Sequence, residues 1–257
     1  MNWGRSFAGR LLRRWLDRRD YVLWRRGSAP FGVFPFHDAD RLLRARGGAV
    51  SLVFDVGANE GQTARVVLGQ FADARVWSFE PQPKAFEALV GQISDPRFSA
   101  FQLALGSSRG VATLYDYSDG PGGSTIGSLV PDARYATQGG FSATTLEVEC
   151  ETLDAFCQAH GVDRIDLLKI DTEGYDLEVL RGAAGLLAAG AVRAVLVEFN
   201  DLTPKAGVTG GALGPIAEFL SPSGFSFLAS YVDWVDDGGA MVVSNALFLL
   251  TSPPSSL

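Results

Sequence analysis

Short apolar runs alternate with amphipathic segments along most of this chain. Runs that read as strands buried on both faces occur at residues 51–54, 75–79, 97–105, 165–170 and 192–199. Between them, apolar residues recur with helical spacing at residues 62–71, 83–93, 153–160, 175–189 and 212–222. Strands that alternate with helices favour a parallel sheet with helices on both faces.

Two regions depart from this alternation. Residues 110–117 and 143–150 alternate apolar and polar positions, which predicts antiparallel strands. The glycine-rich segment 118–140 between them predicts a long loop of the kind that is usually functional. Near the C-terminus, residues 225–232 and 241–250 predict a hairpin. The expected fold class is therefore α/β, with a mostly parallel sheet that ends in an antiparallel hairpin.

The N-terminal segment differs from the rest of the chain. In residues 1–26, Trp3, Phe7, Leu11 and Trp15 follow each other every four positions, and arginines occupy the other face. This pattern predicts a basic amphipathic helix. Such a helix is compatible with self-association, with peripheral membrane contact, or with packing on the body of the protein.

The predicted organisation is an arm followed by one domain. Residues 1–48 form the basic helix, an aromatic connector and a short helix at 38–48, and residues 49–257 form the domain. Residues 1–30 hold eight arginines and two aspartates, a net charge of +6, so the remainder carries −13.

Composition narrows the function classes. The acidic body argues against a broad nucleic-acid surface, so no nucleic-acid partner is expected. Two cysteines and two histidines are too few for a structural zinc site. No apolar run approaches the ~20 residues of a membrane span, and the N-terminus lacks the apolar core of a signal peptide. We expect a cytoplasmic protein.

The segment 52–62 carries the first chemical signal. A strand, a tight turn with Gly57 and Gly61, and a helix form the first half of a nucleotide-binding unit. Glu80 ends the next strand, at a distance that suits the two hydroxyls of a ribose. The glycines are too widely spaced for a pyrophosphate, and Asp55 would oppose one. This pattern favours S-adenosylmethionine, which carries an ammonium and a sulfonium and no phosphate.

Two alternatives remain open at this stage. An NAD(P)-dependent oxidoreductase or epimerase would use the same strand–turn–helix unit, although the glycine spacing disfavours it. A non-catalytic cofactor-binding scaffold, with the basic helix recruiting a partner, is the other.

Five motifs together resemble the FkbM-type S-adenosylmethionine-dependent methyltransferases. They are Asp55-Val-Gly-Ala-Asn-Glu-Gly, Phe79-Glu-Pro, Leu153-Asp154, Leu168-Lys-Ile-Asp-Thr-Glu-Gly-Tyr-Asp-Leu-Glu-Val-Leu-Arg-Gly-Ala, and Val197-Glu-Phe. The resemblance covers about residues 50–250 and implies a Rossmann-like, seven-stranded sheet. It also implies methyl transfer, usually to a hydroxyl of a sugar, glycoside or polyketide-like natural product. The expected partner is a small hydroxylated acceptor.

The resemblance and the residue pattern together give a set of candidate cofactor-binding positions. These are Asp55, Gly57, Ala58, Asn59, Gly61, Gln62, Glu80, Pro81, Ala104, Leu105, Ser124 and Asp171.

An alcohol acceptor needs a general base or a metal, because its oxygen is a weak nucleophile while it keeps its proton. The candidate catalytic residues are Asp171, Glu173 and Lys169 at one strand end, with His37 as an alternative base. Asp171, Glu198 and Asn200 also supply oxygen ligands that suit Mg²⁺, which makes a metal site a further hypothesis.

Overall fold

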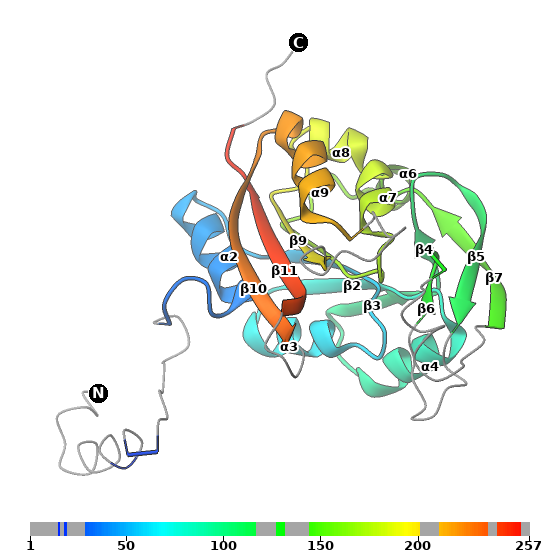
Figure 1. Cartoon of the computed structure of the whole chain (residues 1–257), viewed down its shortest axis with the longest axis horizontal. Coiled ribbons are helices and arrows are strands. Elements are labelled where there is room, and N and C mark those ends of the chain that lie inside the picture. The colour runs from blue at the N-terminus through cyan, green and yellow to red at the C-terminus, as the bar shows by residue number, and fades with distance from the viewer. Residues whose placement is uncertain are drawn as a thin grey trace.

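The computed structural model describes Trp15, Arg18, Arg19 and residues 29–116, 127–131, 144–200, 211–235 and 241–252. A seven-stranded sheet forms its centre (Figure 1), in the order β10-β11-β9-β8-β1-β2-β3. The strands are β1 (Leu52–Val56), β2 (Arg75–Phe79), β3 (Phe98–Phe101), β8 (Leu167–Ile170), β9 (Ala194–Phe199), β10 (Phe225–Val235) and β11 (Met241–Leu250). The first five pair in parallel, while β10 and β11 form an antiparallel hairpin that joins β9. The predicted fold class is confirmed.

Helices cover both faces of this sheet because successive strand residues point to opposite sides. In β1, buried Val53 packs with α2 (Pro35–Ala45) and α3 (Gln62–Gln70). Its neighbour Phe54, also fully buried, packs on the opposite face. The helices of that face are α6 (Leu153–His160), α7 (Asp176–Arg181), α8 (Ala184–Ala188) and α9 (Leu213–Leu220). The remaining helices are α4 (Pro83–Gln92), between β2 and β3, and η2 (Ser221–Ser223).

A second, smaller sheet lies beside the first (Figure 1), in the order β4-β7-β5-β6. Its strands are β4 (Ala104–Leu105), β5 (Gly110–Asp116), β6 (Gly127–Ser128) and β7 (Thr144–Glu151). Antiparallel strands were predicted at β5 and β7, whereas their pairing with each other in a separate sheet was not. The expected strand 97–105 is divided, because the chain leaves the main sheet after Phe101 and Ala104 pairs with Cys150 instead.

Two of the predicted helices differ from the structure in ways that have local causes. α2 begins at Pro35 instead of residue 38, with the proline in its first turn, where the missing N–H is not needed. The helix expected over 175–189 is divided into α7 and α8. At the break, a Cβ on Gly182 would lie 2.0 Å from the carbonyl oxygen of Gly106, so the chain there lies against another backbone segment.

The connection of α2 to the sheet is polar as well as apolar. The Tyr231 hydroxyl of β10 donates to the buried Asp38 carboxylate at 3.0 Å, and the Gly32 N–H donates to the same oxygen at 2.7 Å. The α2 part of the predicted arm is therefore packed on the sheet, and a domain boundary at residue 48 stays a prediction.

The predicted N-terminal helix lies almost wholly outside the described residues. Trp15 is half-exposed and helical, and the Arg19 guanidinium lies 4.7 Å from its ring centre. Within the ranges that the structure describes, none of the helices combines the length and apolar composition needed to cross a bilayer.

Candidate functional site

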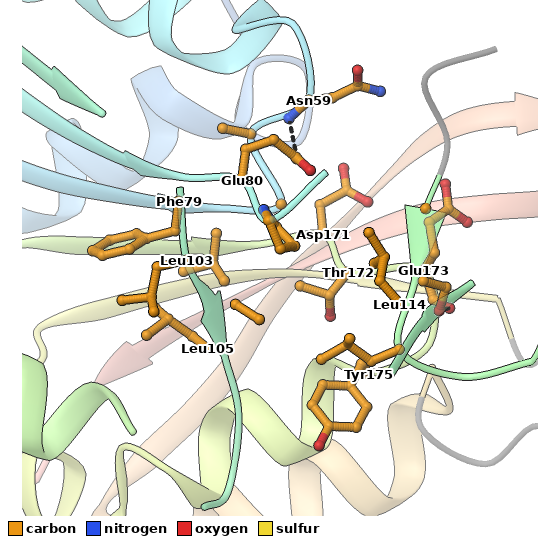
Figure 2. Close-up of a pocket in the computed structure, with 18 of the residues that line it drawn as sticks. Asn59, Phe79, Glu80, Leu103, Leu105, Leu114, Asp171, Thr172, Glu173 and Tyr175 are labelled. Atoms are coloured by element: carbon orange, nitrogen blue, oxygen red, sulfur yellow. Dashed lines mark hydrogen bonds between the residues drawn. The ribbon is translucent and has the colours of Figure 1, made fainter. Parts of the chain in front are cut away.

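A pocket of about 330 Å³ opens where the carboxyl ends of β1, β2, β8 and β9 meet (Figure 2). Crevices beyond these strand ends are where open parallel sheets bind ligands, and the volume lies at the lower end of the range for small-molecule sites. One wall comes from the main sheet. The other comes from the second sheet, through Leu105, Leu114 and Ser128.

The turn after β1 forms the floor of the pocket. Gly57 has φ +80°, and a Cβ there would lie 1.8 Å from the carbonyl oxygen of Asp171. Only glycine allows this turn to pass so close to the end of β8. The N–H groups of Gly57 and Ala58 both donate to the Phe79 carbonyl, at 3.0 and 3.1 Å, so the turn is fixed to β2.

Glu80 stands at the tip of β2 with its carboxylate held by the backbone. Its Oε2 accepts the Asn59 N–H at 2.8 Å (Figure 2), and its Oε1 accepts the Gln82 N–H at 2.8 Å. Each carboxylate oxygen has a further lone-pair direction beyond these bonds. Burial raises the pKa of Glu80 to about 7, although the two N–H groups oppose this shift. The arrangement presents an oriented pair of acceptors to the pocket.

A buried charge cluster underlies the end of β8. The Lys169 ammonium donates to Asp171 Oδ2 at 3.1 Å and to the Ile170 carbonyl at 3.2 Å. Burial works against both charges. Even so, Lys169 holds the pKa of Asp171 below its usual range, and Asp171 with Glu198 holds the pKa of Lys169 above its own. Asp171 is thus an ionised, strongly paired carboxylate.

Glu198 at the end of β9 behaves in the opposite way. Burial and the neighbouring Asp171 raise the pKa of Glu198 well above its usual range. The hydrogen bond between the two side chains raises the pKa of Glu198 and lowers that of Asp171, so a proton shared by the pair is held by Glu198, which donates to Asp171. Two adjacent carboxyl groups thus divide into one acid and one anion, as expected when like charges share a buried site.

Glu173 adopts an unusual backbone conformation at the rim of the pocket. Its φ is +53°, in the left-handed region that costs an ordinary residue about 1–2 kcal/mol. Within the described ranges, Asn59 (φ +47°) is the only other non-glycine residue with positive φ, and both line the pocket. Such strain concentrates at functional sites.

The other end of the pocket is apolar, and only Ala104 and Leu105 of it were predicted from the sequence. Leu103, Leu114 and Tyr175 face the cavity together with Leu105 (Figure 2). Leu114 and Ser128 reach it only because the second sheet folds over the ends of the main strands. No local motif marks such contacts. Tyr175 follows the Glu173-Gly174 turn and lies inside the long motif that begins at Leu168, which was the one signal available.

Most of the predicted cofactor-binding residues meet at this pocket. Those that line it are Gly57, Ala58, Asn59, Gln62, Glu80, Pro81, Ala104, Leu105 and Asp171. Asp55 and Gly61 do not. Asp55 is buried behind the wall, where it accepts the Ser78 hydroxyl at 3.2 Å, and burial raises its pKa to about 7. A Cβ on Gly61 would lie 2.7 Å from Leu89 and Ile93, so this glycine faces α4. Ser124 lies outside the described residues.

The candidate catalytic residues are separated by the fold. Asp171 and Glu173 line the pocket, and Lys169 lies beneath it, 4% exposed. His37 belongs to α2, where its ring packs against Phe34 and Phe71 on the face covered by α2 and α3. It is not among the residues that line the pocket.

The hypothesis of a magnesium site finds no support in the arrangement of ligands. Glu198 and Asp171 bond to each other, and the Lys169 ammonium occupies the position beside Asp171. Asn200 lies next to Gly211, whose carbonyl accepts the Asn200 N–H at 2.9 Å. In the described part of the chain, no group of three or more histidine, cysteine or acidic side chains is arranged to hold a metal ion.

Comparison with known proteins identifies the family. Residues 55–227 of the 257 match the model of the methyltransferase FkbM domain. The chain belongs to the FkbM methyltransferase family. The FkbM resemblance seen in the motifs is thereby confirmed, and with it the activity of an S-adenosylmethionine-dependent methyltransferase.

Two curated relatives span most of this FkbM-family chain. The methyltransferase sdnD of Sordaria araneosa is 27% identical over 220 residues, which cover 75% of this chain and 80% of the relative. The 31-O-demethyl-FK506 methyltransferase FkbM of Streptomyces tacrolimicus is 28% identical over 202 residues, which cover 69% and 74%. A solved TehB-like S-adenosylmethionine-dependent methyltransferase from Corynebacterium glutamicum is 14% identical, with a TM-score of 0.38, and the match covers 94% of this chain and 97% of that one.

Proposed function

We propose that this protein transfers a methyl group from S-adenosylmethionine to a hydroxyl of a small, neutral, polyhydroxylated acceptor. A sugar, a glycoside or a polyketide-like natural product would fit that description. The observation that carries the proposal is the pocket itself. It joins a backbone-held carboxylate suited to a ribose, Glu80, to the carboxylates of Asp171 and Glu173, and its described lining holds no lysine, arginine or histidine.

The residues around β1 and β2 fit the cofactor. Glu80 keeps acceptor directions for the ribose hydroxyls after binding two backbone N–H groups. Gly57 leaves no side chain between the turn and the end of β8. The leucines and Tyr175 offer an apolar surface for an adenine ring. When bound, S-adenosylmethionine supplies a methyl group already activated by a sulfonium.

The charge of the lining supports a neutral acceptor. Among the described lining residues, an acceptor with a carboxylate or phosphate would find no accessible cation beside Asp171 and Glu173, because Lys169 is buried beneath Asp171. Placing like charges together without a partner costs several kcal/mol in a partly desolvated site. The name of the relative FkbM, which acts on an oxygen of a natural product, supports a hydroxyl as the nucleophile.

We assign the general base to Glu173 and an orienting role to Asp171. A base whose pKa is held low by a buried lysine accepts a proton poorly, and this is the situation of Asp171. Glu173 lies at the same pocket on a loop that fixes its direction. In this assignment, Glu173 would take the hydroxyl proton as the acceptor oxygen bonds to the methyl carbon and the bond from that carbon to sulfur breaks, with S-adenosylhomocysteine as the leaving group. Asp171 would accept a hydrogen bond from the substrate.

The test uses deuterated-methyl S-adenosylmethionine and mass spectrometry. Matched acceptors would be offered in one panel: methyl glycosides, the corresponding uronic acids, and hydroxylated macrolides lacking one methyl group. We expect neutral members to gain a labelled methyl group and their anionic counterparts to gain none. Preferential methylation of the anionic members would contradict the assignment of a neutral acceptor, and labelled N-methyl products would contradict the assignment of a hydroxyl.

Glu173→Gln and Asp171→Asn separate the two roles. The first should lower kcat by about 10²–10⁴-fold, the usual contribution of a positioned base. The second should act mainly on the KM of the acceptor. A Glu173→Gln enzyme with unchanged kcat would transfer the base assignment to Asp171.

A further inference from the structure

The loop that carries Glu173 is held by two independent sets of hydrogen bonds. The first comes from the following helix. The buried Asp176 carboxylate accepts the N–H of Thr172 at 3.1 Å and the N–H of Gly174 at 3.2 Å. These bonds close the turn around Glu173, and Gly174 continues it with φ +96°. They fix the shape of the turn without contacting Glu173.

The second set comes from the other sheet and acts on Glu173 directly. The Ser128 hydroxyl donates to the Glu173 carbonyl oxygen at 2.9 Å and accepts the Val130 N–H at 3.0 Å. The contact joins residues 45 positions apart in the sequence. The Val130 N–H therefore orients the Ser128 hydroxyl, which donates its proton to the Glu173 carbonyl.

Ser128 is itself fixed in place by the second sheet. It is 2% exposed and pairs with Tyr115 across β6 and β5. Its neighbour Gly127 packs closely on Leu114, because a Cβ there would lie 3.3 Å from the leucine side chain. Leu114, Gly127 and Ser128 all line the pocket. The Ser128 hydroxyl thus links the Glu173 backbone to the part of the second sheet that lines the pocket.

We propose that Ser128 is a positioning residue for methyl transfer: its hydrogen bond to the Glu173 carbonyl holds this residue in the left-handed conformation that aims its carboxylate at the acceptor. The proposal rests on the proposed function, in which Glu173 is the base. It assigns the small sheet a role in catalysis as well as in enclosing the ligand.

Four variants test the proposal. Ser128→Ala removes the hydroxyl, Ser128→Thr restores it, and Thr113→Ala removes an exposed hydroxyl from β5 of the same sheet as a matched control. The fourth, Ser128→Ala in a Glu173→Gln background, asks whether the serine acts through the glutamate. For each variant, kcat, the KM of the acceptor and the Kd of S-adenosylhomocysteine would be measured.

We expect Ser128→Ala to lower kcat by about tenfold to a hundredfold, because misplacing a reacting group by an ångström costs about this much. The Kd of S-adenosylhomocysteine should stay within about twofold, since Glu80 holds the cofactor side. Ser128→Thr should recover most of the activity, and Thr113→Ala should match the wild type. In the Glu173→Gln background, Ser128→Ala should have almost no further effect, as expected for two residues that act as one unit.

The overturning results are equally specific. The proposal fails if Ser128→Ala keeps the wild-type kcat, if it weakens cofactor binding and kcat in parallel, or if its effect is undiminished in the Glu173→Gln background. Amide hydrogen exchange over residues 172–175 provides a readout that needs no acceptor. Exchange should accelerate in Ser128→Ala relative to Thr113→Ala, and equal rates would overturn the proposal.

Failure of the proposed function would look different. If the wild-type protein bound S-adenosylhomocysteine but methylated no hydroxylated acceptor, the assignment of the acceptor would fail. The exchange experiment would still decide whether Ser128 holds the Glu173 backbone.

Discussion

Replacing Glu80 with glutamine tests the cofactor site with almost no change in shape. The carboxylate accepts the N–H groups of Asn59 and Gln82, one on each oxygen. An amide keeps one of these bonds but turns an NH₂ group toward the other N–H, or toward a ribose hydroxyl. In either orientation, the site loses a charge-assisted acceptor.

The magnitude follows from the number of bonds affected. A hydrogen bond to a charged group is worth about 1.5–3 kcal/mol. Losing one therefore raises the Kd of S-adenosylhomocysteine by about 10- to 150-fold, at 1.4 kcal/mol for each factor of ten. Stability should change less, because the substitution also removes a carboxyl group whose pKa burial has raised to about 7.

Isothermal titration calorimetry at several pH values would measure the effect. For the wild type, affinity should increase as the pH rises through about 7, because Glu80 must be ionised to accept the ribose hydroxyls most strongly. Glu80→Gln should remove most of this pH dependence. The control is Glu87→Gln, an exposed position on α4. A Glu80→Gln protein that binds within twofold of the wild type would refute the assignment of Glu80.

Three further predictions concern the framework of the site. Gly57→Ala should lower the free energy of unfolding by about 2–4 kcal/mol, because it adds left-handed strain to a clash with the Asp171 carbonyl. The control is Gly69→Ala on α3, where a Cβ meets open space, and it should raise the free energy of unfolding by about 0.5–1 kcal/mol. Urea unfolding would measure both variants, and unchanged stability of Gly57→Ala would contradict the account. Lys169→Met should lower the free energy of unfolding by about 1.5–3 kcal/mol, because it removes the buried cation that bonds to the partly exposed Asp171. Lys84→Met, at an exposed position, should change it very little. Equal losses of the two variants in chemical denaturation would contradict this role of Lys169. Without ligand, the contribution of Glu80 to the free energy of unfolding should decline as the pH rises from about 4.5 to about 7, because the folded state binds its proton more tightly than the unfolded state. Denaturation across this pH range should therefore show a smaller loss of stability in Glu80→Gln than in the wild type. A larger loss in Glu80→Gln would contradict this prediction.

The sequence predicted the parts of the site that depend on local signals. The apolar run before Gly57, the glycine turn and the acid at the tip of β2 are each encoded within a few residues. Topology then brings them together, since carboxyl ends of parallel strands meet at one edge. For this reason the sequence alone predicts that Gly57, Asn59, Glu80, Asp171 and Glu198 lie at one pocket, and all five line it.

Long-range packing accounts for what the sequence did not show. Leu114 and Ser128 line the pocket because two short strands fold over it, and a two-residue strand such as β6 has no periodicity to detect. Asp55 is the first residue of the glycine motif, yet its side chain lies beside Ser78 and Lys169, behind the pocket lining. A motif gives the residue types of a turn, whereas which side chains face the ligand depends on the packing of neighbouring strands.

The protonation states in the cluster also required the fold. Asp171 and Glu198 are equivalent in the sequence as acids at strand ends. Lys169 bonds to Asp171 and lowers its pKa, while burial and that same anion raise the pKa of Glu198. Asp171 and Glu198 lie close together, as the metal hypothesis expected, but the Lys169 ammonium and a proton shared between the two carboxyl groups balance their charge.

Direct binding of the cofactor tests the central claim, that the pocket beside Gly57 and Glu80 serves S-adenosylmethionine. The purified protein would be titrated calorimetrically with S-adenosylmethionine, S-adenosylhomocysteine and NAD under identical conditions. We expect both sulfur compounds to bind with one site per chain and NAD to give no saturable heat. Binding of NAD in preference to the sulfur compounds, or binding of none of the three, would contradict the account.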